Sequence, residues 1–256
     1  VTAPKGSVVN AEFPSPVVYA NHEMSHRTAD MVMGALAKFW PEQVMACSQG
    51  TSAILTFGGL DPRTRRRYVS YETIKGGFGA RPNKDGINVI ASAISNTMNT
   101  PIEVLEMAFP LRVENYVIEP DTGGSGKYRG GCAARRVWRL LPDADAVGSL
   151  CMERMTSPPF GLQGGGAGAP ATVVLTTPDG KSRNLPSKGA FDAPGGSVVD
   201  LLTPGAGGFG PPADRDPAAV GRDLLDGYVT PEAARDDYGV SDPDALRAAA
   251  ELDDDT

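Results

Sequence analysis

The stretch that decides the fold is Ala53-Ile54-Leu55-Thr56-Phe57, followed after a short interval by Tyr68-Val69-Ser70-Tyr71-Glu72. Both runs are rich in apolar, aromatic and β-branched residues, and they follow the two-residue period of a half-buried strand. The interval, Gly58-Gly59-Leu60-Asp61-Pro62, has the composition of a turn. The stretch therefore predicts a β-hairpin, and hence a β-sheet in this part of the chain.

Upstream of the hairpin the period of the apolar residues is that of a helix. The spacing predicts a helix from Asn21 to Phe39, which Pro41 stops. Its predicted apolar stripe consists of Thr28, Val32, Ala35, Leu36 and Phe39, and the opposite side carries Glu23, Arg27, Asp30 and Lys38.

Downstream of the hairpin the predicted elements are short. Pro101 opens a helix that ends near Phe109, with Thr100 as its N-cap and Glu103 completing a capping box. After this helix, strand signals predominate until two short helices and an acidic, mobile tail end the sequence. The expected strands are 111–118, 133–141, 147–152, 171–177 and 197–202, the helices are 217–225 and 231–237, and the tail, with room for a short helix, is 241–256.

Together these elements predict an α+β fold: an N-terminal helix with a mixed sheet, a β-rich middle and short C-terminal helices. We expect three parts. Residues 1–110 hold the helix, the mixed sheet and the candidate pocket, residues 111–210 form the β-rich part, and residues 211–256 form the C-terminal helices and the acidic tail.

Composition narrows the class of protein. Gly and Pro supply 31 and 22 of the 256 residues, which argues against a helical bundle, and 41% apolar residues suffice for a core. A net charge of −7 argues against nucleic acid as the main partner. No apolar run approaches the roughly 18 residues that span a membrane, and the N-terminus has no apolar signal region.

The three cysteines and the first residue bear on where the protein works and how it is made. Cys47, Cys132 and Cys151 are too few for a disulfide framework and too far apart for a known metal motif, so we expect a cytoplasmic protein. The chain begins with Val1 rather than Met, and residues 7–11 have the pattern of a strand already under way. We therefore expect a fragment or a processed chain.

The sequence contains one motif typical of zinc peptidases, His22-Glu23-Met24-Ser25-His26. On a helix, two histidines four residues apart share a face and can bind Zn²⁺, with the glutamate placed to activate water. Against this function, these are the only histidines, and the pair lies in the first turn of the predicted helix, where the backbone frays. A third ligand would have to be a carboxylate, such as that of Glu42. We keep the zinc site as an alternative hypothesis.

Other catalytic motifs are absent from the sequence. The run Asp121-Thr122-Gly123-Gly124-Ser125-Gly126-Lys127-Tyr128 lacks the first Gly of a phosphate-binding loop and the Ser or Thr that follows its Lys, so we predict a tight turn between strands. No G-x-S-x-G motif occurs, and a lone Cys47 is more often buried than catalytic.

Read in order, the unusual segments resemble the hydantoinase B/oxoprolinase family, specifically the C-terminal half of its chains, from about residue 8 to residue 240. The first motifs are Val9-Asn10-Ala11, Gly34-Ala35-Leu36-Ala37, Ala46-Cys47-Ser48-Gln49-Gly50, Tyr71-Glu72-Thr73-Ile74-Lys75-Gly76-Gly77-Phe78-Gly79-Ala80-Arg81 and Asn96-Thr97-Met98-Asn99-Thr100-Pro101. Later motifs are Gly123-Gly124-Ser125-Gly126-Lys127-Tyr128-Arg129-Gly130-Gly131, Pro159-Phe160-Gly161-Leu162-Gln163-Gly164-Gly165 and Thr203-Pro204-Gly205-Ala206-Gly207-Gly208-Phe209-Gly210.

This resemblance implies a segment or subunit of an ATP-dependent enzyme that opens cyclic amides such as hydantoins, 5-oxoproline or lactams. The alternative within the family is a ketone carboxylase acting on acetone or acetophenone. By resemblance, ATP binds to a partner, a hydantoinase A type subunit. Also by resemblance, a divalent metal has its ligands in the N-terminal half of the B subunit, outside this segment.

The chemistry implied by the family guides the choice of candidate residues. Phosphorylation of an amide oxygen makes its carbon a better electrophile for water, and this step needs donors for an oxyanion or a phosphate and a carboxylate base. The candidate catalytic residues are Glu72, Arg81, Asp85, Asn96, Asn99 and Glu103. Three alternatives remain: turn, capping and ion-pair roles for these residues, a scaffold without catalytic groups, and the zinc peptidase.

Overall fold

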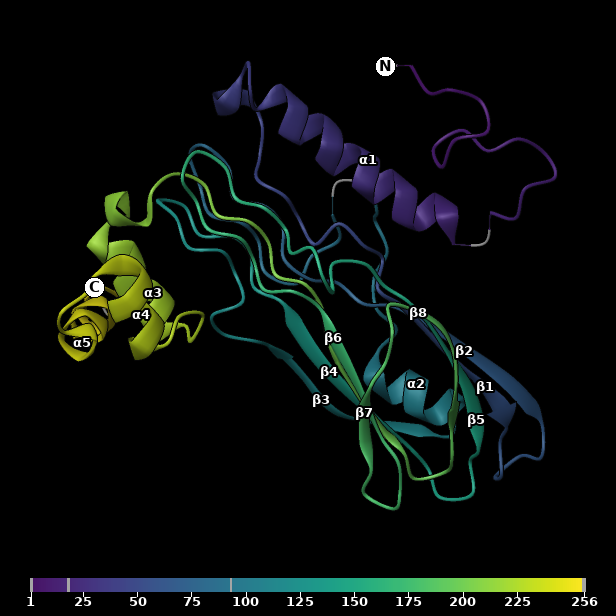
Figure 1. Ribbon diagram of the computed structural model, residues 1–256. Helices are drawn as coiled ribbons and strands as arrows, with labels where there is room; N and C mark the ends of the chain where they lie inside the picture. Colours follow the sequence, from purple (N-terminus) through teal and green to yellow (C-terminus); the bar gives the residue numbers. More distant parts are fainter. Residues whose placement is uncertain (1, 18, 93, 255–256) are drawn as a thin grey trace.

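The computed structural model describes residues 2–17, 19–92 and 94–254, so Val1 and the end of the predicted tail, Asp255 and Thr256, lie outside the described residues. Two antiparallel sheets lie at one end of the molecule, three helices gather on the side away from them, and helix α1 (Ala20–Leu36) runs along a third side (Figure 1). The predicted α+β class is confirmed. No helix in the described ranges is long and apolar enough to cross a membrane.

The first sheet contains the predicted hairpin and has the strand order β2-β1-β5-β8. Its strands are β1 (Ile54–Leu60), β2 (Arg67–Thr73), β5 (Ala146–Cys151) and β8 (Lys188–Ala193). The hairpin register runs from Ile54 opposite Thr73 to Leu60 opposite Arg67, so the residues predicted as a turn, Gly58 to Leu60, continue β1. All pairings in this sheet are antiparallel, where we had expected a mixed sheet.

The second sheet has the order β3-β4-β9-β6-β7 and packs its inner face on the first. Its strands are β3 (Leu111–Ile118), β4 (Ala134–Leu140), β9 (Val198–Leu202), β6 (Thr172–Thr176) and β7 (Ser182–Asn184). Leu55 and Phe57 of the first sheet share the core with Trp138 and Leu201 of the second, and α2 (Ile102–Ala108) adds Leu105. Burial of such side chains stabilises each by about 1.5–3 kcal/mol, so this core is the main source of stability.

The predicted strands agree with the observed ones to within one residue at each end, except that β1 extends three residues beyond its predicted end at Phe57, and β7 and β8 were not predicted. The first sheet takes strands from both sides of the expected boundary at residue 110, which remains a prediction. Helix α2 starts without the predicted capping box, because Pro101 takes the N-cap position and no side chain caps the helix.

The C-terminal helices form a small separate core. They are α3 (Pro217–Leu225), α4 (Pro231–Tyr238) and α5 (Pro243–Asp254), and two 3₁₀ turns occur at Pro41–Gln43 and Pro212–Asp214. Asp216 and Thr230 cap α3 and α4. Leu246 of α5 packs with Val220 and Leu224 of α3, so residues 243–254 form a packed helix where we had expected a mobile tail.

Six extended, glycine-rich segments lie side by side between the sheets and the C-terminal helices (Figure 1). We call them the glycine bundle: residues 46–50, 76–81, 86–90, 123–131, 161–168 and 204–210. Their hydrogen bonds connect each segment to several neighbours: Gly77 N–H donates to Pro204 O (3.1 Å), while Gln49 N–H donates to Gly77 O (2.8 Å). Residues 121–128 connect β3 and β4 as predicted, but as part of a long extended segment rather than a tight turn, and their glycines allow close backbone approach.

Glycine is required in the bundle because no space remains for a side chain. A Cβ at Gly79 would lie 1.8 Å from Ala46 O, and a Cβ at Gly131 would lie 2.1 Å from Ile87 O. Neither glycine has a positive φ. Space, rather than a left-handed backbone, therefore selects the residue type at these two positions.

Helix α1 packs with the face opposite to the predicted one. Glu23, His26 and Asp30 are buried, whereas Val32 lies outward and Phe39, just beyond the helix end, is 77% exposed. Hydrophobic periodicity assumes that the apolar stripe is the buried one. Here three polar side chains at i, i+3 and i+7 are buried instead, and each has partners from distant segments.

Candidate functional site

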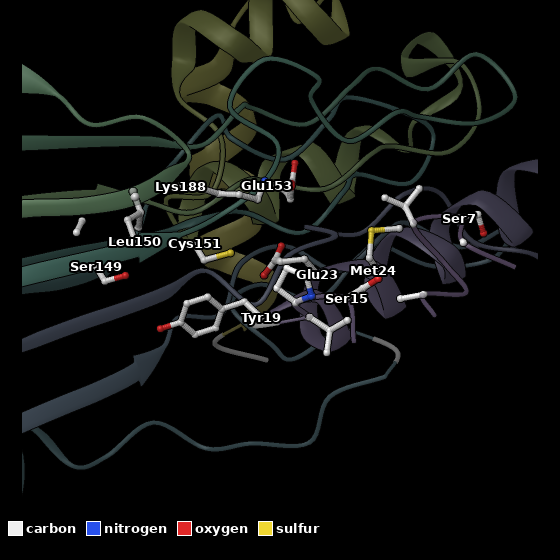
Figure 2. Close-up of a pocket in the computed structure, with 17 residues that line it drawn as sticks. Ser7, Ser15, Tyr19, Glu23, Met24, Ser149, Leu150, Cys151, Glu153 and Lys188 are labelled. Carbon is white, nitrogen blue, oxygen red and sulfur yellow. Dashed lines mark hydrogen bonds and ion pairs between the residues drawn. The ribbon is translucent and has the colours of Figure 1, made fainter. Parts of the chain in front are cut away.

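A pocket of about 720 Å³ lies between the N-terminal segment, the first turn of α1 and the ends of β5 and β8 (Figure 2). Apolar walls come from Val8, Val17 and Met24, and Glu23 and Cys151 lie at its base. In Figure 2 the Glu23 carboxylate points toward Cys151. A mostly apolar cavity with a few converging polar groups is the usual form of a small-molecule site.

The Glu23 carboxylate is held in one orientation. One oxygen accepts from the Thr51 hydroxyl (2.7 Å) and the other from Ser52 N–H (3.0 Å), and the residue is 4% exposed. Burial raises the pKa of Glu23, and the two hydrogen bonds only partly offset this effect. A carboxylate with a raised pKa accepts a proton at neutral pH more readily than an exposed one.

The rim of the pocket carries charge and its base carries a thiol. Lys188 forms an ion pair with Glu153, and Arg27 lies 3.7 Å from the same carboxylate. Burial, and then the nearby Glu23 carboxylate, raise the pKa of Cys151 to about 11, so the thiol is protonated at neutral pH. The pocket thus offers one carboxylate base, one neutral thiol and a charged rim.

His26 lies one turn further along α1 and is enclosed by hydroxyls. Its Nδ1 lies 2.5 Å from Ser92 Oγ and its Nε2 lies 3.1 Å from Ser52 Oγ. Burial and the positive charge of Lys75 lower the pKa of His26 to about 4. The imidazole is therefore neutral at physiological pH.

The zinc hypothesis does not fit this geometry. Both ring nitrogens of His26 have hydroxyl partners, and His22 lies on the exposed side of α1. No group of three or more His, Cys, Asp or Glu side chains is placed to hold a metal ion in residues 2–17, 19–92 and 94–254. The side chains around His22 and His26 therefore do not fit a metal.

Asp30 completes the buried face of α1. Its carboxylate pairs with Arg154 (2.7 Å), whose Nη2 also lies 2.8 Å from Cys47 Sγ. Burial raises the pKa of the Cys47 thiol, which is 2% exposed, so the expectation of a buried cysteine is confirmed. Together these contacts attach α1 to the glycine bundle.

The six residues predicted from the sequence fall into separate groups, and none lines the pocket. Glu72 pairs with Arg136 (2.9 Å) in the core. Asn99 accepts from the Tyr116 hydroxyl (3.2 Å) and donates to Thr73 O (3.2 Å), so it lies in the same region as Glu72. Arg136 is fully buried, and the Tyr116 ring lies under its guanidinium.

The remaining four lie elsewhere. Arg81 donates to the backbone carbonyl of Asp85 (3.1 Å), while the Asp85 carboxylate pairs with Arg215 (2.7 Å), next to the C-terminal helices. Asn96 and Glu103 are exposed. From the sequence, Glu23 was assigned only to the zinc motif and to the polar, outward side of the predicted helix. The spacing of Glu23, His26 and Asp30 was the available signal for a buried polar face.

The fold and the site define a two-sheet α+β protein built around a glycine bundle, with a carboxylate pocket at one edge of the first sheet. The chain belongs to the hydantoinase B/oxoprolinase family, whose profile matches residues 1–212. This confirms the resemblance drawn from the sequence motifs.

Relatives and a solved structure agree with this membership. An uncharacterised protein of Methanocaldococcus jannaschii is 37% identical over 94% of this chain and 41% of its own length. A putative B-type subunit of a D-/L-hydantoinase from Pseudomonas sp. is 34% identical over 96% of this chain and 41% of its own length. The crystal structure of ATP-dependent caprolactamase from Pseudomonas jessenii superposes with a TM-score of 0.83 at 28% identity, over 98% of this chain and 46% of that chain. The chain thus spans about two fifths of the length of these two curated relatives.

Proposed function

We propose that this chain is a segment of an ATP-dependent hydrolase of cyclic amides, such as hydantoins, 5-oxoproline or lactams, and that the pocket beside Glu23 receives the ring. The observation that carries the proposal is the buried Glu23 carboxylate, oriented by Thr51 and Ser52 in the wall of a mostly apolar pocket of about 720 Å³. Membership in the hydantoinase B/oxoprolinase family supports it.

The chemistry assigns one role to each part of the pocket. Once ATP has phosphorylated the amide oxygen, water attacks the ring carbon, and a base must take the proton of that water. Glu23 is suited to this step because its raised pKa makes it a stronger base and its two hydrogen bonds fix its direction. The apolar wall of Val8, Val17 and Met24 fits the methylene groups of a ring.

The remaining components of the enzyme are proposed to lie on other chains or segments. ATP binds to a hydantoinase A type subunit, and the N-terminal half of the B subunit supplies the ligands of a divalent metal. The assembly works in the cytoplasm, in keeping with three cysteines that are all buried free thiols.

The test is turnover by the assembled enzyme with ATP and divalent metal, measured on caprolactam, hydantoin and 5-oxoproline as ring-opened product. We expect Glu23→Gln to lower product formation by about 10²–10⁴-fold, the contribution of a general base. The matched control is Glu232→Gln, an exposed carboxylate of α4 outside the pocket. Wild-type rates for Glu23→Gln, or no turnover of any ring by the wild-type enzyme, would contradict the proposal.

Two alternatives have defined outcomes in the same assay. If Asn96→Ala and Glu103→Gln slow turnover while Glu23→Gln does not, the residues predicted from the sequence carry the reaction instead. If ATP consumption requires bicarbonate and a ketone such as acetone, the enzyme is a carboxylase, because a hydrolase has no use for bicarbonate.

A further inference from the structure

The outer face of the first sheet is largely uncharged, and no other element of the described chain covers most of it. The strand register places seven residues of the four strands side by side on this face: Thr56, Gly58, Val69, Tyr71, Val147, Ser149 and Ala190. Gly58 lies between Val69 and Val147. Thr56 lies between Tyr71 and Ser149. Val69 is 71% exposed, Val147 55% and Tyr71 47%. Charged residues of these strands that share this side, Arg67, Lys188 and Asp192, lie only at its margins.

The second sheet of the same molecule shows what a solvent-facing surface looks like in this protein. Its outward side carries ion pairs between Arg135 and Asp200 (2.6 Å), between Arg135 and Glu119 (3.7 Å), and between Arg139 and Glu114. An antiparallel sheet with one face in water normally alternates apolar inward with polar outward residues. The second sheet places ion pairs among outward apolar residues such as Val137 and Val174, whereas the first sheet has charged residues only at the margins of its outer face.

One end of the outer face is already covered. Ile54 lies on the same side of β1 as Thr56 and Gly58, yet it is fully buried, and its partner Cys151 is 4% exposed. The cover comes from α1 and from segment 6–17, which face Cys151 and Ser149 across the pocket (Figure 2). Two residues further along β1 the cover ends, and the pocket lies at its edge.

We propose that a further layer of the B-type polypeptide, from the portion of the family's chains that this chain does not span, packs on the outer face and closes the open side of the pocket. The matched relatives supply enough chain, since this chain spans only 41% of the hydantoinase B-type subunit from Pseudomonas sp.. Continuity favours this occupant, because segment 6–17 of the same polypeptide already forms the covered end. The nearly uncharged face fits an apolar layer and offers no complement to a charged surface.

Photo-crosslinking in the assembled enzyme tests this inference without using activity, so its outcome is separate from that of the proposed reaction. A benzoyl-phenylalanine probe replaces Val69 or Val147, and the matched control places it at Val174 on the outward side of the second sheet. Peptides joined to each probe are identified by mass spectrometry.

We expect the Val69 and Val147 probes to link to B-type peptides outside these 256 residues, and the Val174 probe to give no such link. Links to a second copy of this chain, links to the A-type subunit, or no links would each overturn the inference. As a second measurement, Val69→Lys with Val147→Lys should lower the urea midpoint of the assembled enzyme, because two ammonium groups would enter an apolar interface. An unchanged midpoint for this double variant, with Val174→Lys as the control, would also overturn the inference.

Discussion

A single methyl group at Gly77, in the middle of the glycine bundle, should destabilise the protein severely. The Cβ of Gly77→Ala would lie 2.1 Å from Gly131 O and 2.6 Å from Ala206 N, whereas ordinary contact begins near 3.4 Å. Both obstacles are backbone atoms and cannot move aside by a rotamer change. The neighbouring segments must therefore separate by roughly an ångström.

Separation on this scale breaks three hydrogen bonds that hold four of the segments together. Gly77 N–H donates to Pro204 O, Gln49 N–H donates to Gly77 O, and Ala206 N–H donates to Gly131 O. Three buried bonds at about 1 kcal/mol each, together with about 1–3 kcal/mol of overpacking, lower the free energy of unfolding by roughly 4–6 kcal/mol. A loss of this size is a large fraction of the total stability of a typical domain.

The assay is urea denaturation followed by the fluorescence of Trp138, which is buried in the main core. Two alanine variants separate space from backbone conformation. At Gly58 the nearest atoms are 3.7 Å away, so alanine should change stability by no more than about 1 kcal/mol, in the stabilising direction. At Gly180, with φ +82° and open space, alanine should cost about 1–2 kcal/mol through strain alone. If Gly77→Ala leaves the free energy of unfolding within about 1 kcal/mol of the original chain, the close-approach argument is refuted.

Three further predictions concern buried charge. The pKa of His26 is about 4 in the folded state, below its ordinary value of 6.5, so the unfolded state binds more protons between these two pH values. The free energy of unfolding should therefore fall as the pH drops from 6.5 to 4. Urea denaturation at several pH values should show a weaker pH dependence for His26→Gln. Glu72→Gln leaves the Arg136 guanidinium buried without an anion, so the free energy of unfolding measured in urea should fall by about 3–5 kcal/mol. The double variant Glu72→Leu with Arg136→Met removes both charges and should recover most of this loss. Asp223→Asn removes the shared anion of Arg129 and Arg215 and should accelerate tryptic cleavage within the C-terminal helices, while unchanged cleavage would show that these pairs do not anchor them.

The elements that the sequence predicted well are those whose local pattern and tertiary role agree. Strand Leu111–Ile118 and helix Pro217–Leu225 match their predicted bounds. The strand was predicted from apolar alternation and the helix from a Pro at its first position, and both signals depend only on residues close together in the sequence. The hairpin was placed correctly, but Gly58 and Gly59 were assigned to a turn on composition alone. Strand β8 was missed because its Gly189 weakens the strand pattern.

The inverted face of α1 could not be predicted from periodicity. Glu23, His26 and Asp30 are stabilised inside by Thr51, Ser92 and Arg154, which are remote in sequence. The same long-range pairing explains the candidate site, because the pocket joins α1 to β5 and β8, which lie far along the chain. The predicted candidates came from one stretch of motifs, and the fold distributes them over the core, the bundle and the surface.

The glycine bundle has a consequence for the order of events during folding. Its six segments come from residues 46 to 210, and its hydrogen bonds join the first of them to the last, as where Gly207 N–H donates to Cys47 O (2.8 Å). Such contacts have a high sequence separation, and glycine loses more conformational entropy on ordering than any other residue. A nascent chain in which residues 204–210 have not yet left the ribosome therefore cannot close the bundle, and the earlier segments lack these partners until that point.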